Sequence, residues 1–328
     1  MKVLVTGSAG HLGEALARAL PERGIQVRGV DVKDSPLTEA VGSIAERRFV
    51  DQCMQGVDAV IHAATLHKPH VVTHSRRDFV DTNVSGTLNL LEAAVEAGAR
   101  AFVFTSTTSA FGRSLVPPPG APAAWVTEAT PSLPKNIYGL TKRAAEDLCE
   151  LVHREHGLPC LVLRTSRFFP EEDDNRKSRS AYDDANLKAN EFLHRRVDIE
   201  DAVEAHRLAV ERAPALGFGS YIISATTPFS EADLAELREA TPTVVDRLFP
   251  AWREEYDRRG WRMFPGIDRV YVNEAARSDL GWRPRYDFAR VLAQLQADEP
   301  VGSELARIVG SKGYHAEQFA DGPYPVPH

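Results

Sequence analysis

Apolar and polar positions alternate along the first third of the chain in a pattern that predicts strands and helices in turn. The run KVLVT at residues 2–6 is apolar and rich in β-branched residues, and beyond three glycines the segment EALARAL has helical spacing. Further apolar runs bounded by turn residues predict strands at residues 26–30, 39–44, 57–64 and 101–105. Helical patterns lie between these runs, at residues 46–55 and 78–97. Five strands that alternate with helices indicate an α/β protein with a doubly wound parallel sheet.

The later part of the chain is expected to return to this sheet and then to leave it. The pattern predicts a helix over residues 138–156, and a helix at 198–212 followed by a strand at 221–224. The second helix and its strand are expected to rejoin the sheet. Residues 229–328 have a mainly helical pattern and end in a tail rich in Pro and Gly, so we expect a smaller helical region there.

Three glycines connect the first strand to the first helix. Gly7 permits a sharp turn, Gly10 lets the backbone approach a pyrophosphate, and Gly13 lets the helix pack closely on the sheet. Asp31 follows the second strand, where a carboxylate accepts hydrogen bonds from an adenosine ribose diol, so the pattern favours NAD. Two alternatives remain open: an ordinary strand–turn–helix unit without a ligand, and NADP, whose 2′-phosphate would meet the nearby cations Lys33 and Arg28.

Hydroxyl groups and a Tyr/Lys pair supply the candidate chemistry. Residues 106–109, SerThrThrSer, follow a strand at the edge where parallel sheets place their ligands. Tyr138 and Lys142 are four residues apart and share one helix face. A free tyrosine has a pKa of about 10, so a phenolate near neutral pH needs roughly 3–5 kcal/mol of stabilisation, which Lys142 and an oxidised nicotinamide could supply together. The alternative is a surface helix on which the two residues occur by chance.

Composition excludes several classes of function. The 328 residues are 43% hydrophobic, enough for a sizeable core, and the net charge of −7 argues against a nucleic-acid surface. No apolar run approaches the length of a membrane span, and the first strand begins at Lys2, which leaves no room for a signal peptide. Three scattered cysteines show neither metal-ligand spacing nor a disulfide framework. We therefore expect a cytoplasmic protein without a metal, a nucleic-acid partner or a membrane partner.

Several segments together carry a resemblance to a known family. They are IHAA (61–64), NVSGTLNLLEAA (83–94), TSTTSAFG (105–112), YGLTK (138–142), LVLR (161–164) and DLGWRP (279–284). With the glycine pattern, they make the chain resemble the extended short-chain dehydrogenase/reductases, in particular the NAD-dependent epimerase/dehydratase family and its UDP-glucose 4-epimerase-like members.

The resemblance implies a domain organisation and a set of site residues. A Rossmann-type NAD-binding domain would cover residues 1–165 with 197–226, and a smaller, mainly helical substrate-binding cap would cover 166–196 and 227–328. Thr107 would bind the substrate hydroxyl, Tyr138 would remove its proton, and Lys142 would bind the nicotinamide ribose and lower the pKa of the tyrosine. The implied cofactor-binding residues are Gly7, Gly10, His11, Leu12, Gly13, Asp31, Ser43, Ile44, Ala63, Ala64, Thr65, Asn83, Thr105, Tyr138 and Lys142. The implied substrate-binding residues are Thr107, Thr108, Arg167 and Arg176.

The chain departs from the family pattern at two of these places. Ser43 stands where the family usually has an aspartate that touches the adenine, so adenine contacts there would come from elsewhere, such as the Ile44 backbone. Dehydratases of the family carry an Asp-Glu pair directly after the catalytic threonine, whereas Thr107 is followed by Thr108 and Ser109. Elimination of water therefore lacks its acid/base pair at this position.

The substrate segment is short and charged. About thirty residues separate Arg164 from Asp198, and the stretch 170–176 resembles the corresponding part of uronate dehydrogenases. Arg167 or Arg176 could pair with a substrate carboxylate, or both could form salt bridges with the acidic residues 171–174. We predict NAD-dependent oxidation of a carbohydrate hydroxyl, by preference on a free sugar or sugar acid. A nucleotide-sugar epimerase and a non-catalytic NAD-binding protein are the alternatives.

A homodimer is also expected from the resemblance, because the family commonly pairs the helices that correspond to 78–97 and 138–156. The two helices carry apolar residues at helical spacing, namely Leu88, Leu91, Val95, Ala144, Leu148 and Leu151. The same stripe would also serve the core of a monomer.

Overall fold

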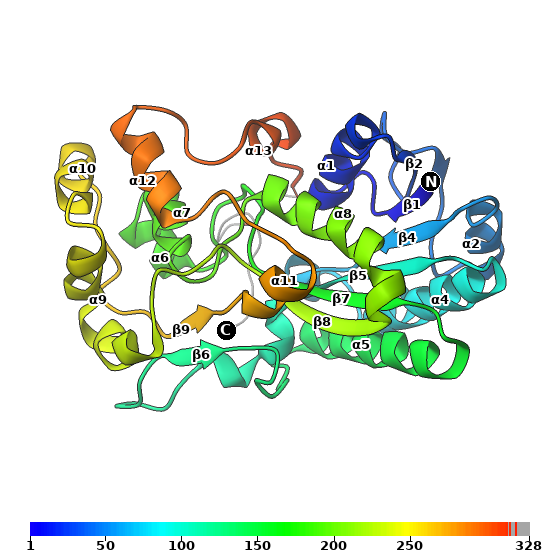
Figure 1. The fold of residues 1–328 in the computed structure, drawn as a ribbon, viewed down its shortest axis with the longest axis horizontal. Coiled ribbons are helices and arrows are strands. Elements are labelled where there is room, and N and C mark those ends of the chain that lie inside the picture. Colours follow the sequence, from blue (N-terminus) through cyan, green and yellow to red (C-terminus); the bar gives the residue numbers. More distant parts are fainter. Residues whose placement is uncertain (314, 316–318, 320–328) are drawn as a thin grey trace.

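A seven-stranded parallel sheet forms the centre of the computed structural model, which describes residues 1–313, 315 and 319 (Figure 1). The strand order is β3-β2-β1-β4-β5-β7-β8. The strands are β1 (Lys2–Thr6), β2 (Gln26–Asp31), β3 (Ala40–Val41), β4 (Ala59–His62), β5 (Ala101–Thr107), β7 (Cys160–Thr165) and β8 (Phe218–Ile223). Each neighbouring pair is parallel, so the predicted doubly wound α/β sheet is confirmed.

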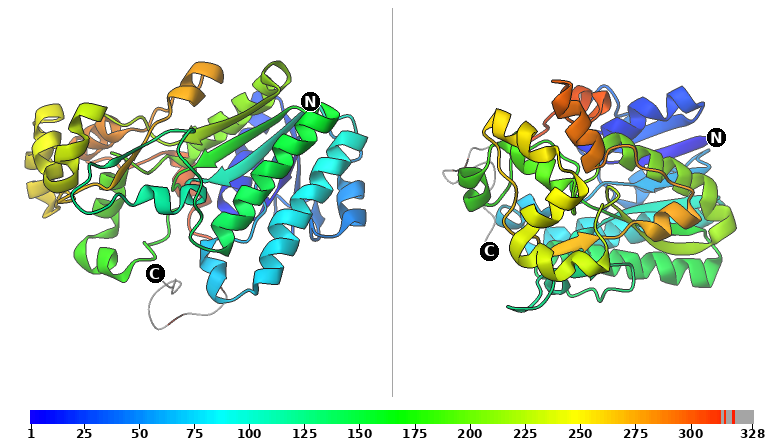
Figure 2. Two further views of the ribbon diagram at one scale, coloured as in Figure 1. Left: turned by 90° about the horizontal axis from the view of Figure 1, so that it is seen from below. Right: turned by 60° about the vertical axis from the view of Figure 1, so that its left-hand side comes forward.

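Helices cover both faces of this sheet (Figures 1 and 2). One face packs on α1 (His11–Ala19), α8 (Ile199–Leu216), α11 (Glu274–Asp279) and α13 (Glu304–Val309). The other face packs on α2 (Arg47–Cys53), α4 (Gly86–Glu96) and α5 (Ile137–His156). Successive strand residues supply opposite faces: Val3 and Val5 belong to the first core and Leu4 to the second.

The long helix expected at residues 78–97 is divided into three parts. α3 (Arg76–Val80) and α4 are joined by a π-helical turn, η3 (Asp81–Ser85). Within this turn the Asn83 side chain bonds to the Leu66 backbone and to the Thr141 hydroxyl. The widened turn thus directs a buried amide toward the loop after β4, in keeping with the frequent occurrence of π-turns at functional sites.

A second apolar core lies beyond the sheet. It is built mainly from aromatic and aliphatic residues of α7 (Asp184–Glu191), α9 (Leu234–Leu248), α10 (Trp252–Arg259), α12 (Phe288–Gln296) and the segments that join them. The short helix α6 (Arg176–Ala181) precedes this group. The remaining short helices are η1 (Pro21–Arg23), η2 (Lys68–Val72), η4 (Thr108–Phe111), η5 (Arg113–Leu115) and η6 (Glu231–Asp233). This region is mainly helical, as predicted.

Two features of the second region were not predicted. β6 (Ala124–Val126) pairs in parallel with β9 (Arg269–Tyr271) and forms a small separate sheet. Two C-terminal helices belong to the first core rather than to the second: α11 contacts β8, and α13 contacts α1 and α8. The division into cofactor and substrate domains stays a prediction.

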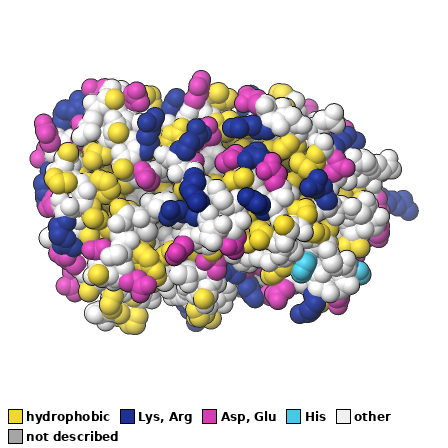
Figure 3. All heavy atoms as spheres, in the orientation of Figure 1, with side chains coloured by type: hydrophobic (Ala, Val, Ile, Leu, Met, Phe, Trp, Pro, Cys, Tyr) yellow, Lys and Arg dark blue, Asp and Glu magenta, His cyan; other side chains and the backbone are white. Residues whose placement is uncertain are grey.

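Charged residues of both signs are interspersed on the face shown in Figure 3. Among the described residues, no helix is both long and apolar enough to cross a membrane.

Candidate active site

A cavity of about 1260 Å³ opens at the carboxyl ends of the central strands. Single ligand sites commonly measure about 300–1,000 Å³, so this volume suits a dinucleotide together with a substrate. Most of the predicted site residues line it: Gly7, Gly10, His11, Leu12, Gly13, Asp31, Ser43, Ile44, Ala63, Ala64, Thr65, Thr105, Thr107, Thr108, Tyr138 and Arg167. Asn83 and Lys142 are buried behind the lining, and Arg176 lines a separate depression at the start of α6.

The glycine turn fits the phosphates of a dinucleotide. Gly7 has a φ of 77°, and a Cβ atom placed on it would lie 2.9 Å from the Ala64 nitrogen. A Cβ on Gly13 would lie 1.9 Å from the Gly7 carbonyl oxygen, so glycine alone allows this packing. Gly10 is the N-cap of α1 and makes no side-chain cap bond, which leaves the first N–H groups of the helix for a ligand.

Asp31 lies at the end of β2, beside the turn. Its carboxylate accepts hydrogen bonds from the backbone N–H groups of Ala9 (3.0 Å) and Lys33 (2.9 Å) while lining the cavity. Arg28, considered above as a partner for a 2′-phosphate, is instead bonded to Glu39 and to two backbone carbonyls. The arrangement favours the ribose diol of NAD.

The loop after β4 is held from behind by buried polar residues. Thr6 Oγ1 accepts hydrogen bonds from the backbone N–H groups of Ala63 and Ala64, each at 3.1 Å. His62 bonds to Thr6 through Nδ1 (2.8 Å) and to Thr87 through Nε2 (2.9 Å). Burial lowers the pKa of His62 well below its usual value, so the ring is neutral and structural. Asn83 supports the same loop, and its predicted cofactor contact stays a prediction.

Thr107 and Tyr138 both line the cavity, and the Thr107 hydroxyl is near enough to the phenol to influence its pKa. Asn136 caps α5 by accepting a hydrogen bond from the Gly139 N–H at 3.1 Å. This cap fixes the first turn of α5, which carries Tyr138. Burial raises the pKa of Tyr138 to about 12, although the nearby Thr107 hydroxyl opposes this shift. Burial thus keeps the phenol protonated near neutral pH.

Lys142 contacts the backbone of β5 in this structure, and its predicted role toward the nicotinamide ribose and the pKa of Tyr138 stays a prediction. Its Nζ donates to the Thr105 carbonyl at 2.7 Å and lies 4.0 Å from the centre of the Phe104 ring. Burial lowers the pKa of Lys142 to about 7, against the opposing charge of Glu146. The lysine thus ties α5 to β5 and holds Tyr138 opposite Thr107.

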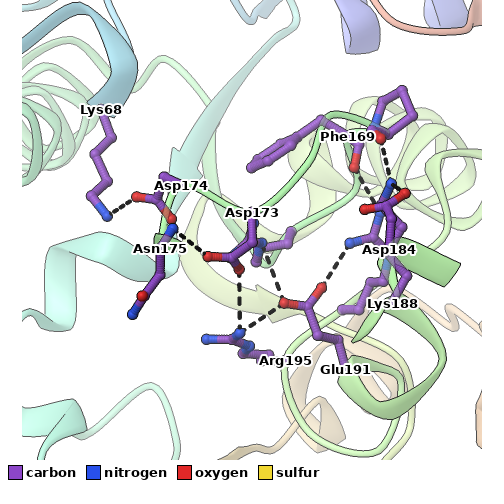
Figure 4. A network of polar contacts seen from close by, with 12 residues as sticks. Lys68, Phe169, Asp173, Asp174, Asn175, Asp184, Lys188, Glu191 and Arg195 are labelled. Carbon is purple, nitrogen blue, oxygen red and sulfur yellow. Dashed lines mark hydrogen bonds and ion pairs between the residues drawn. The ribbon is translucent and has the colours of Figure 1, made fainter. Parts of the chain in front are cut away.

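A charged network lies on the substrate side (Figure 4). Asp173 accepts a hydrogen bond from Arg167 at 2.7 Å, and Glu191 is ion-paired with Arg195 and Arg196, each at 2.8 Å. Burial alone would raise the pKa of Glu191, but the surrounding guanidinium groups hold it well below its usual range. Arg167 is therefore paired with an acidic neighbour, which is the alternative left open by the sequence.

The C-terminal segment returns to the glycine turn. Glu171 accepts hydrogen bonds from His11 Nε2 (2.7 Å) and from the backbone N–H groups of Lys312 (2.9 Å) and Gly313 (3.2 Å). Although burial opposes it, the bond to His11 helps to lower the pKa of Glu171 to about 2. Lys312 Nζ pairs with Glu14 at 2.5 Å, so the segment around Lys312 meets α1 at the cofactor end of the cavity.

Sequence reasoning did not find several residues that line the cavity. They are His67, Lys68, Arg113, Lys135, Arg195, Arg269, Tyr271 and Lys312. No local motif marks them, because they reach the cavity from segments far apart in the chain.

Comparisons with known proteins agree with this geometry. Residues 3–218 match the model of the NAD dependent epimerase/dehydratase family. A dTDP-glucose 4,6-dehydratase of Streptomyces antibioticus is 31% identical over 335 residues, covering 90% of this chain and 91% of the relative. A UDP-glucose 4-epimerase of Streptomyces lividans is 27% identical over 323 residues, covering 88% of this chain and 94% of the relative.

The fold is also found among solved structures. A short-chain dehydrogenase/reductase superfamily protein of Agrobacterium tumefaciens, solved with bound NAD, has a TM-score of 0.65 and 24% identity over 90% of this chain and 96% of that one. The family assignment confirms the expected class of cofactor, NAD. The chain belongs to the NAD-dependent epimerase/dehydratase family.

Proposed function

We propose that the protein oxidises a carbohydrate hydroxyl with NAD+, and that its substrate is a free sugar or sugar acid. The observation that carries the redox role is that Thr107 and Tyr138 line the same cavity as the glycine turn and Asp31. This arrangement brings a proton acceptor and a hydroxyl-binding group to the ligand edge of a parallel sheet.

Oxidation of an alcohol removes a proton from oxygen and a hydride from carbon. Bound NAD+ supplies the hydride acceptor and a positive charge. Thr107 Oγ1 orients the substrate hydroxyl, and Tyr138 takes its proton once the phenol has been deprotonated. Because burial raises the pKa of Tyr138 to about 12, the residue becomes a base only when positive charge approaches it.

Elimination of water has less support, even though one relative is a dehydratase. Thr108 and Ser109 line the cavity after Thr107, and the Ser109 N–H donates to Thr107 Oγ1 at 3.1 Å. Neither hydroxyl can serve as the acid or base that a carboxyl pair would provide at this position.

A nucleotide-sugar epimerase is the second candidate, because a relative that covers most of the chain is named a UDP-glucose 4-epimerase. The free sugar is preferred because only the two short helices α6 and α7 lie between β7 and α8. Two acidic residues of this connecting segment, Asp173 and Glu191, are engaged with arginines.

A paired screen separates the two candidates. NADH formation is measured at 340 nm with free aldoses, uronates and aldonates, and UDP- and dTDP-sugars are analysed by chromatography for isomerisation. NADH formed in step with substrate loss supports a dehydrogenase. Isomerisation of a nucleotide sugar without net NADH refutes that proposal and establishes the epimerase, whereas NAD binding without any turnover would indicate a binding protein.

A further inference from the structure

We propose that Arg113, Lys135 and Arg269 form an anion site at the substrate end of the cavity, which selects substrates bearing a carboxylate or phosphate group. All three residues line the cavity that contains Tyr138. The inference rests on the proposed function for the reacting hydroxyl, and it adds the charge that the substrate must carry.

A close backbone contact brings Arg113 and Lys135 together. Gly112 has a φ of 54°, and a Cβ on it would lie 2.0 Å from the Leu133 carbonyl oxygen. The same carbonyl accepts the Arg113 N–H at 2.8 Å, so the two segments run side by side. Lys135 follows two residues later and directly precedes Asn136, the cap of α5, so the cation stands one helical turn before Tyr138.

Arg269 reaches the same wall from the C-terminal region. It begins β9 and pairs with Ala124 of β6, and its Nε donates to the Tyr271 hydroxyl at 3.3 Å. The carbonyl of Arg269 is bonded to His194, which fixes the strand from its other side. The small sheet thus positions a half-buried arginine opposite the start of α5.

The three cations lack the acidic partners that their neighbours possess. Lys68 pairs with Asp174, Arg167 with Asp173, and Arg195 with Glu191. By contrast, no carboxylate of the described residues lies within 4.0 Å of the side-chain nitrogens of Arg113, Lys135 or Arg269. Burial and then the charges of Arg269, Lys68 and Arg113 lower the pKa of Lys135, which shows that the cations repel one another.

An anion relieves this repulsion, and a neutral ligand does not. Carboxylate and phosphate oxygens accept charge-assisted hydrogen bonds from guanidinium and ammonium groups, and arginine can bind either group with two parallel bonds. The glycine turn and Asp31 lie toward the β2 side of the sheet, whereas this cluster lies beyond β5. The cluster is therefore placed for the substrate rather than for the adenosine half of the cofactor.

The test compares charged and neutral ligands on the full-length, NAD+-loaded protein. Inorganic phosphate and a hexuronate serve as binding probes in isothermal titration calorimetry, and KM is measured for a uronate, a sugar phosphate and a neutral aldose. The variants are Arg269→Gln and Lys135→Gln. Arg100→Gln is the matched control, because this exposed arginine stands before β5 at the opposite end of the strand.

Each site variant should weaken probe binding and raise KM for anionic substrates by about tenfold, with less than a twofold change for a neutral aldose. The preferred probe tells whether carboxylate or phosphate is the natural group. Thermal unfolding verifies that the variants are folded, and exposed Lys135 provides a second test if Arg269→Gln is unstable.

Unchanged affinity in both site variants, or turnover that prefers neutral sugars, overturns the anion site. If the variants lose affinity for phosphate while the screen shows isomerisation of a nucleotide sugar without net NADH, the anion site stands and the free-sugar function fails. If the variants lose phosphate or uronate binding and the wild-type protein turns over no sugar, the anion site is supported and the proposed redox function is refuted.

Discussion

Two glycine substitutions in the same turn separate packing from cofactor binding. In Gly13→Ala the new Cβ would lie 1.9 Å from the Gly7 carbonyl oxygen, whereas ordinary contact begins at 3.4 Å, so α1 must move by about 1.5 Å. Overpacking of this kind costs about 1–3 kcal/mol. With an unfolding entropy of about 2.1 cal/mol/K per residue over 328 residues, this corresponds to a fall in Tm of about 1.5–4 °C. In Gly10→Ala the nearest atom is 3.2 Å away, so the cost to folding should stay below about 1 kcal/mol.

The two variants should therefore differ in which property they lose, thermal stability or affinity for NAD+. Gly10→Ala should unfold within about 1.5 °C of the wild type. It should bind NAD+ about tenfold more weakly or worse, because its Cβ occupies the approach of the pyrophosphate. Gly13→Ala should lose both stability and binding. Differential scanning calorimetry and titration of NAD+ measure the two quantities separately. Wild-type affinity for NAD+ in Gly10→Ala, or a wild-type Tm in Gly13→Ala, would refute the reasoning.

Three further predictions concern the cofactor, the C-terminal segment and the assembly. Asp31→Ala should weaken NAD+ far more than NADP+, because it removes a ribose acceptor and a repulsive charge; equal weakening in a fluorescence titration would show that Asp31 does not recognise the ribose. Glu171→Gln should destabilise the protein near neutral pH. The difference in stability between variant and wild type should vanish as pH falls from about 4.5 to about 2. The reason is that the lowered pKa of Glu171 stabilises the fold only while its carboxylate is ionised. A pH-independent difference in Tm would contradict this. The protein should form a homodimer through α4 and α5, which lie side by side (Figure 2). Leu88 of α4 and Leu148 of α5 are half-buried apolar residues. A single species of 36 kDa in light scattering at micromolar concentration would refute this prediction.

Local pattern was sufficient for the sheet and for the cofactor end of the cavity. The strands at 2–6 and 101–105 are mainly apolar runs, and the glycine turn follows the first of them directly, so neighbouring residues define both the element and its role. β6 and β9 are three residues long and about 140 residues apart, and such short strands exist only through their mutual pairing.

The contacts of individual side chains were less predictable from the sequence than the helices and strands that carry them. Helical spacing placed Lys142 on the same face as Tyr138, but burial beneath β5 directs its ammonium group to the Thr105 carbonyl. For Arg167 the sequence allowed a substrate or an acidic neighbour, and only the fold shows that Asp173 lies within hydrogen-bonding distance. The contact between Glu171 and Lys312 joins residues 141 apart, so no local signal could have indicated it.

The central claim, that Tyr138 is the base of an NAD-dependent oxidation, is tested most directly by the kinetics of Tyr138→Phe. The measurement is kcat for NADH formation on the substrate found in the screen, together with the Kd for NAD+. The account predicts that kcat falls at least a hundredfold while the Kd changes less than about twofold, because the phenol acts on the substrate proton and not on the dinucleotide. A variant that keeps more than a few percent of the wild-type kcat would contradict the account and require a different base.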